Sequence, residues 1–169
     1  PSLHEICDLG PVENPGDVRT IMDQYGVKVE WRRVDDCFRI ISKYSDGSPM
    51  DVTMPSGIEP FIDKMEEYVP GSRPQMTKLF DLFQEVLDGI AYITASSGHA
   101  DSNVLKEKYP NMLRTGAYPT KKVFDALKLP LRAQDILATY WSYLGVDMEH
   151  LAFIHYAAMV HKYVSRGAY

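Results

Sequence analysis

The sequence predicts an α+β domain in which a small antiparallel sheet of about three strands packs against a mostly helical C-terminal part. Three strand-like runs follow one another between residues 27 and 54, and Asp46-Gly47 joins the second run to the third. An Asp-Gly pair between two such runs is a strong hairpin signal. From residue 58 onward the apolar residues recur at helical spacing, so this region can supply the layer that covers the apolar face of the sheet.

The segment before the hairpin predicts an extended stretch, a helix and a first strand. Residues 2–9 are mixed in character, and we expect them to be extended. A helix is expected to open around Asp17, shortly after Pro15, and to end at Gly26. In residues 27–34 apolar and charged side chains alternate, which is the pattern of a half-buried strand.

Helices are predicted for most of the remaining chain. The expected helices cover residues 58–68, 74–96, a short stretch that ends at Tyr109, a stretch capped by Thr120, 131–144 and 148–164. The helix over 74–96 carries apolar residues on more than one stripe. Such a helix is buried on several sides or lies against an apolar molecule.

Composition and charge narrow the class of protein. A chain of 169 residues fits one domain, spanning 1–169, with a sizeable core. The net charge of −5 and the lack of a basic patch argue against nucleic-acid binding. Cys7 and Cys37 make no disulfide framework, so reduced thiols in a cytoplasmic protein are expected. No segment has the apolar length of a transmembrane helix.

The familiar motifs of nucleotide, metal and nucleophile chemistry are missing from the sequence. The eleven glycines never occur two apart, which excludes a Gly-x-Gly-x-x-Gly fingerprint, and there is no P-loop. The five histidines form no His-Glu-x-x-His pair, and we expect no metal site. Without a Gly-x-Ser-x-Gly motif, the sequence names no catalytic nucleophile.

One group of residues remains as a candidate binding site. The apolar helix over 74–96 is accompanied by two C-terminal helices that are rich in aromatic side chains. These helices either form an ordinary core or surround a large apolar pocket with a few polar tips. The C-terminal members of the group are Tyr140, Trp141, Tyr143, Phe153, His155, Tyr156 and Tyr163.

Four stretches resemble consecutive segments of one known family. They are residues 3–7, the strand–Asp-Gly–strand element of residues 38–54, residues 58–71, and residues 154–169. The family is that of the phytoene desaturase-like flavoproteins, which includes carotenoid desaturases and retinol saturases, and the chain is similar to their middle portion. In that family the FAD-binding segments lie outside the matched region. The resemblance therefore implies a substrate-binding domain excised from a two-domain flavoprotein, and an initial proline without a Met agrees with a cut piece.

The resemblance also implies a chemistry and a set of site residues. The parent protein would use FAD to act on carbon–carbon bonds of an apolar, isoprenoid- or carotenoid-like substrate, as a desaturase or a saturase. This chain would contribute a dry pocket, contact the FAD-binding domain of the same parent, and be inactive alone. His4 and His155 are the candidates for polar groups near the flavin. The candidate substrate-binding residues are Phe80, Phe83, Leu87, Tyr140, Trp141, Phe153 and Tyr156.

Two other functions remain open on the sequence alone. The first is a stand-alone α+β module that binds a lipid or a protein partner with the same apolar helices and carries out no catalysis. The second is the substrate domain of an amine oxidase-like flavoenzyme. Peripheral membrane contact, and self-association of the isolated piece through the face that met the flavin domain, are further expectations.

Overall fold

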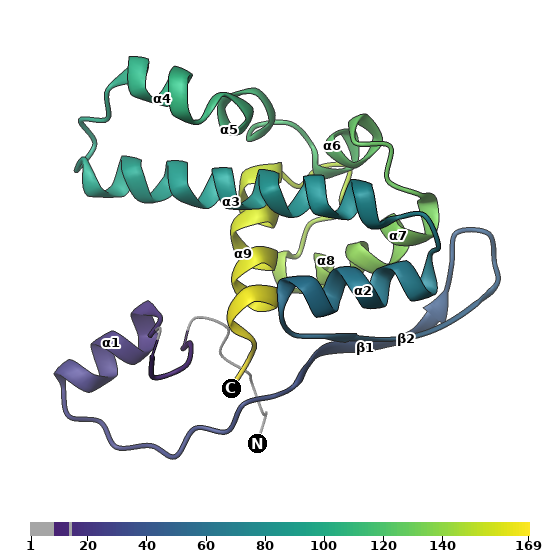
Figure 1. Cartoon of the computed structure of the whole chain (residues 1–169), viewed down its shortest axis with the longest axis horizontal. Helices are drawn as coiled ribbons and strands as arrows, with labels where there is room; N and C mark the ends of the chain where they lie inside the picture. The colour runs from purple at the N-terminus through teal and green to yellow at the C-terminus, as the bar shows by residue number, and fades with distance from the viewer. Residues whose placement is uncertain (1–8, 14) are drawn as a thin grey trace.

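The computed structural model describes residues 9–13 and 15–169 and confirms the α+β class (Figure 1). A two-stranded antiparallel sheet lies beside α2, and the longer helices α3 and α9 cross one another in the middle of the molecule. His4, Cys7 and nearly all of the stretch expected to be extended fall outside the described residues. The elements are α1 (Asp17–Gln24), β1 (Asp36–Lys43), β2 (Pro49–Pro55), α2 (Ile58–Tyr68), α3 (Arg73–Ala95), α4 (Ser102–Lys108), α5 (Pro110–Thr115), α6 (Thr120–Ala126), α7 (Leu131–Leu137), the 3₁₀ turn η1 (Ala138–Tyr140), α8 (Trp141–Leu144) and α9 (Phe153–Arg166).

The predicted hairpin is present. β1 and β2 pair from Lys43–Pro49 at the turn to Asp36–Pro55 at the open end. Gly47 supplies the positive φ of 82° that the turn requires. Alternate residues of β2 are buried against α2, which gives the sheet its covered face: Met50, Val52 and Met54 from the strand, and Phe61, Ile62 and Met65 from the helix.

The prediction of a third strand over residues 27–34 is wrong for the described part of the chain. This segment runs outside the sheet, and only Val34 forms an isolated bridge, with Ala168. Val27 and Val29 are 45% and 50% exposed. Alternation specifies which side chains share a face, but a strand also needs a neighbour for its backbone groups. Among the described residues, such a neighbour is present only at Val34.

Polar contacts with α7 hold the tip of the hairpin in place. Arg132 donates to Asp46 Oδ2 at 2.8 Å, and its guanidinium lies 4.7 Å from the centre of the Tyr44 ring. One helical turn later, Asp135 accepts hydrogen bonds from the backbone and hydroxyl of Ser45. Hydrogen bonds from Ser48, reinforced by Arg132, lower the pKa of Asp46 to about 2. The contact of Arg132 with Asp46 and that of Asp135 with Ser45 each join α7 to a hairpin tip that is far away in the sequence.

The helix expected over 131–144 is divided in the structure. Residues Ala138–Tyr140 form a 3₁₀ turn between α7 and α8. A 3₁₀ turn advances about 120° per residue and an α-helix about 100°, so three residues shift the buried stripe by about 60°. Tyr140 is consequently buried, whereas Trp141 faces outward with 55% of its surface exposed.

The last helix begins later than expected, at Phe153 instead of residue 148. Asp147 accepts hydrogen bonds from the backbone N–H groups of Glu149 and His150 and holds a turn there. An isolated bridge with Pro119 keeps Ala152 extended. Thr120 likewise does not cap α6, because its hydroxyl donates to Leu151 O at 2.9 Å. These contacts tie the start of α6 to the start of α9.

Candidate functional site

Five of the seven candidate substrate-binding residues lie in the packed core. The Phe83 ring is in contact with Phe80, Phe153 and Tyr156 at centroid distances of 5.4, 5.7 and 5.9 Å. Tyr140 packs against Phe38 on β1, at 5.2 Å. All five are buried, and none of them lines the cavities of about 470, 480 and 360 Å³ that the domain contains. Their contact with a substrate stays a prediction.

The remaining candidates do not join this cluster. Leu87 is half-buried and lines a cavity of about 360 Å³ between α3 and the C-terminal half of α9. Trp141 is exposed and lines a second cavity, beside α6 and α7. His155 is exposed on α9, and His4 lies outside the described residues. The structure thus brings together the buried aromatic residues, and the assignments of His4 and His155 to the flavin side stay predictions.

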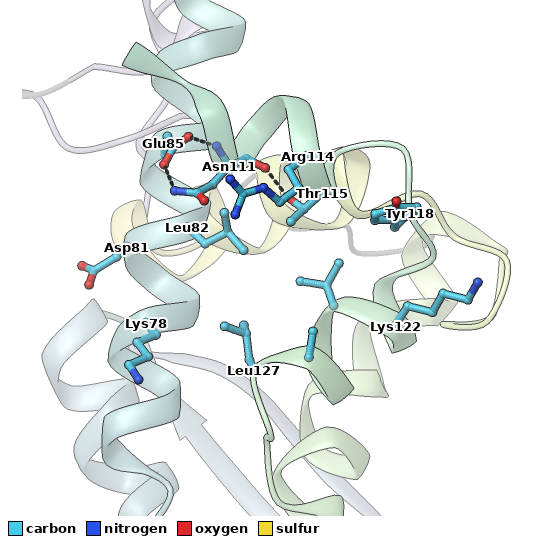
Figure 2. Close-up of a pocket in the computed structure, with 12 residues that line it drawn as sticks. Lys78, Asp81, Leu82, Glu85, Asn111, Arg114, Thr115, Tyr118, Lys122 and Leu127 are labelled. Atoms are coloured by element: carbon cyan, nitrogen blue, oxygen red, sulfur yellow. Dashed lines mark hydrogen bonds between the residues drawn. The ribbon is translucent and has the colours of Figure 1, made fainter. Parts of the chain in front are cut away.

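The cavity shown in Figure 2 has the volume and the mostly apolar lining of a small-molecule site. It lies between α3, α5 and α6, and its volume is about 470 Å³. Small-molecule sites in proteins have volumes of about 300–1,000 Å³ and are mostly apolar, with a few polar groups. The apolar floor is formed by Leu82, Val123, Ala126 and Leu127. We call this cavity the α3–α6 pocket.

Helix α5 forms one wall of the α3–α6 pocket and is fixed to α3 by Glu85. The two carboxylate oxygens of Glu85 accept from Asn111 N at 2.6 Å, Asn111 Nδ2 at 2.7 Å and Met112 N at 3.1 Å. Backbone N–H groups in the first turn of a helix need such acceptors. Gly89, one turn further along α3, leaves room for the side chain of Met112. The wall therefore depends on two residues of α3.

The rim of the α3–α6 pocket carries an excess of positive charge. The rim has three cationic side chains, Lys78, Arg114 and Lys122, and two carboxylates, Asp81 and Glu85. The oxygens of Glu85 already accept hydrogen bonds from α5. In Figure 2 the Arg114 side chain runs along the edge of the opening toward Leu82, whereas Lys78 and Lys122 point outward. An apolar floor with a cationic rim suits an elongated apolar molecule, and it suits one with an acidic or neutral polar end better than one with a cationic end.

In the sequence, the apolar residues of the pocket belong to apolar stripes and carry no other signal. Leu82 belongs to the long helix predicted over 74–96, and Val123 and Leu127 belong to the stretch capped by Thr120. Nothing in their spacing separates them from core residues. Arg114 lies in α5, for which no helix was predicted. The sequence pattern does not give the position of α5, because that position is set by contacts with Glu85 and Gly89 of α3.

The described residues contain neither a cluster of metal ligands nor a membrane-spanning helix. Within residues 9–13 and 15–169, no three His, Cys, Asp or Glu side chains gather in a way that could hold a metal ion. Across the same residues, no helix combines the length and the apolar character needed to span a bilayer.

Comparison of the chain with protein-family models, with curated proteins and with solved structures returned no match. The geometry and the sequence resemblance are therefore the grounds for the function proposed below.

Proposed function

We propose that this chain is the substrate-binding part of an FAD-dependent oxidoreductase that acts on carbon–carbon bonds of an apolar, isoprenoid-like substrate. The observation that carries the binding role is the α3–α6 pocket, with its apolar floor and its volume of about 470 Å³. The resemblance to phytoene desaturase-like flavoproteins supplies the reaction class. The substrate lies along Leu82, Val123 and Leu127, with any polar end toward Arg114.

The flavin is assigned to another part of the parent protein. The chain lacks the glycine spacing that lets a backbone approach a pyrophosphate, and its own residues do not fit a dinucleotide. No reaction step is assigned to a side chain of this domain. Its contribution is to remove an apolar molecule from water, at about 25 cal/mol for each Å² of apolar surface buried, and to orient it.

The N-terminal arm, residues 15–34, offers the surface for the FAD-binding domain. Helix α1 buries none of its residues, and it stands apart from the other helices (Figure 1). Arg19 connects this arm to the C-terminal end, because its guanidinium lies 5.7 Å from the centre of the Tyr169 ring; it also donates to Gly10 O at 3.0 Å. Val34 donates to Ala168 O at 2.8 Å. These contacts join the N-terminal arm to the C-terminal residues of the domain, and this joined surface is the one that would receive the FAD-binding domain.

A substitution in the pocket floor tests the binding role. Leu82→Lys places a charge among apolar side chains, and we expect it to weaken binding of farnesol, measured by displacement of the dye anilinonaphthalenesulfonate, by at least about tenfold, or ~1.4 kcal/mol. The matched control is Leu113→Lys. Leu113 lies on α5, is 50% exposed and does not line the pocket.

The two variants must first show the same cooperative unfolding as the unchanged chain. Farnesol binding that is lost in Leu82→Lys and kept in Leu113→Lys supports the proposal. Equal binding by both variants, or no binding by the unchanged chain, contradicts it.

A further inference from the structure

A second cavity, on the opposite side of α6, differs from the α3–α6 pocket in the charge of its rim. Its volume is about 480 Å³. Val123 and Ala126 of α6 and the following residue Leu127 line the first cavity, whereas Lys121 and Phe124 of α6 line the second. Its apolar walls are formed by Phe124, Leu131, Ala138, Trp141 and Met148. We call it the Trp141 pocket.

Carboxylates dominate the rim of the Trp141 pocket. Asp135, Asp147 and Glu149 line it, and Lys121 is the only cation among the residues that the structure places there. The charge of Lys121 is already matched, because its ammonium group contacts both oxygens of Asp125 at 2.6 and 2.7 Å. Asp125 does not line the pocket. A ligand that enters from solvent therefore meets a negative potential.

The three carboxylates differ in how far they are already engaged. Asp135 is bound to Ser45, and Asp147 to the backbone of the following turn and to His150 Nδ1 at 2.8 Å. The hydrogen bond from His150 is the main cause that lowers the pKa of Asp147, so this carboxylate is charged at neutral pH. Within residues 9–13 and 15–169, no hydrogen bond or ion pair engages the side chain of Glu149, so it is the carboxylate most free to pair with a ligand.

Two aromatic and polar features make the site more than an acidic patch. Trp141 exposes more than half of its surface beside the carboxylates, and an indole face attracts an organic cation. Gln134 also lines the pocket and is 93% buried, with 7% of its surface exposed. Its amide nitrogen donates to Leu129 O at 2.9 Å and to Asp125 Oδ1 at 3.2 Å, while its oxygen has no donor within the described part of the chain. A buried acceptor without a donor favours a ligand that brings N–H groups.

We propose that the Trp141 pocket binds a primary amine with an aromatic or aliphatic body, the ammonium group lying between Glu149, Asp147 and the Trp141 face. The body packs against Phe124, Met148 and Leu131, and the N–H groups distinguish a primary ammonium from a quaternary one. The inference does not depend on the proposed function, because the two cavities share no lining residue.

The test uses phenethylamine and its matched anion, phenylpropionate, followed by two-dimensional NMR of the chain. We expect phenethylamine to shift the Trp141 indole N–H and the amides of residues 131–149, and phenylpropionate to shift none of them. The trimethylammonium derivative of phenethylamine should bind more weakly than the primary amine, because it has no N–H to donate.

Two variants locate the site. Glu149→Gln and Trp141→Leu should each weaken phenethylamine binding by about two- to fivefold, as expected for an exposed ion pair and an exposed cation–π contact. Lys122→Gln, on the other face of α6, should leave it unchanged. Equal shifts with phenylpropionate, shifts confined to other parts of the chain, no binding of the amine, or unchanged affinity in both variants would each overturn the proposal.

Discussion

Replacing Phe83 by alanine is expected to lower the free energy of unfolding by about 3–5 kcal/mol. Phe83 is fully buried on α3 and touches three other rings, from α3 and α9. Truncation removes these contacts and leaves a cavity that the surrounding helices cannot fill completely. Urea denaturation followed by circular dichroism measures the loss. Phe83→Leu keeps most of the volume and should lose clearly less.

This variant also distinguishes the two interpretations of the aromatic cluster. A core residue gives the large loss, whereas a residue that lines an open substrate tunnel gives a small one, because solvent or ligand already occupies the space beside it. The matched surface control is Leu113→Ala, for which a change within about 0.5 kcal/mol is expected. A loss below about 1 kcal/mol for Phe83→Ala would favour the tunnel and count against the packing described above.

Replacing Gly89 by leucine is expected to displace α5 from α3 and to lower stability by about 1–3 kcal/mol. A Cβ at this position would overlap Met112 Sδ and would lie 2.9 Å from Met112 Cε and 3.3 Å from Tyr109 Cγ. Met112 is 4% exposed, so its side chain has little room to move away. Since α5 supplies a wall of the α3–α6 pocket, farnesol binding should fall together with stability.

A double variant identifies the cause. Met112→Ala removes the atoms that the new side chain meets, so Gly89→Leu combined with Met112→Ala should lose less stability than the sum of the two single losses. Gly89→Ala is the mild case, in which a gain of up to about 1 kcal/mol in helix propensity opposes the contact with a flexible side chain. Strict additivity in the double variant would show that Gly89 does not position α5 through Met112.

Local patterns predict the elements whose own residues determine them. The helix expected over 74–96 is observed as Arg73–Ala95, because a proline near its start and a long apolar pattern specify it without help from the rest of the chain. The hairpin around Asp46-Gly47 is predictable for the same reason, since its turn residues fix the register of both strands.

Elements that depend on distant partners are predicted less well. The alternation in residues 27–34 indicates a strand but not the neighbour it requires, and the described structure supplies one only at Val34. The 3₁₀ turn that takes Trp141 out of the core leaves no local signature of the kind that Gly and Pro provide. Both cavities also depend on distant partners. The α3–α6 pocket depends on the packing of α5 against Glu85 and Gly89. The Trp141 pocket depends on the packing of α6, α7 and the turn at Asp147.

The measurement that tests the central proposal most directly is a visible absorbance spectrum of the purified, natural full-length protein that contains this sequence. The proposed function predicts co-purifying flavin, seen as the yellow absorbance bands of oxidised FAD, and bleaching of those bands on reduction. A protein that is stable, binds farnesol and is colourless would contradict the assignment to a flavin-dependent oxidoreductase. It would leave a domain that binds apolar molecules in the α3–α6 pocket without redox chemistry.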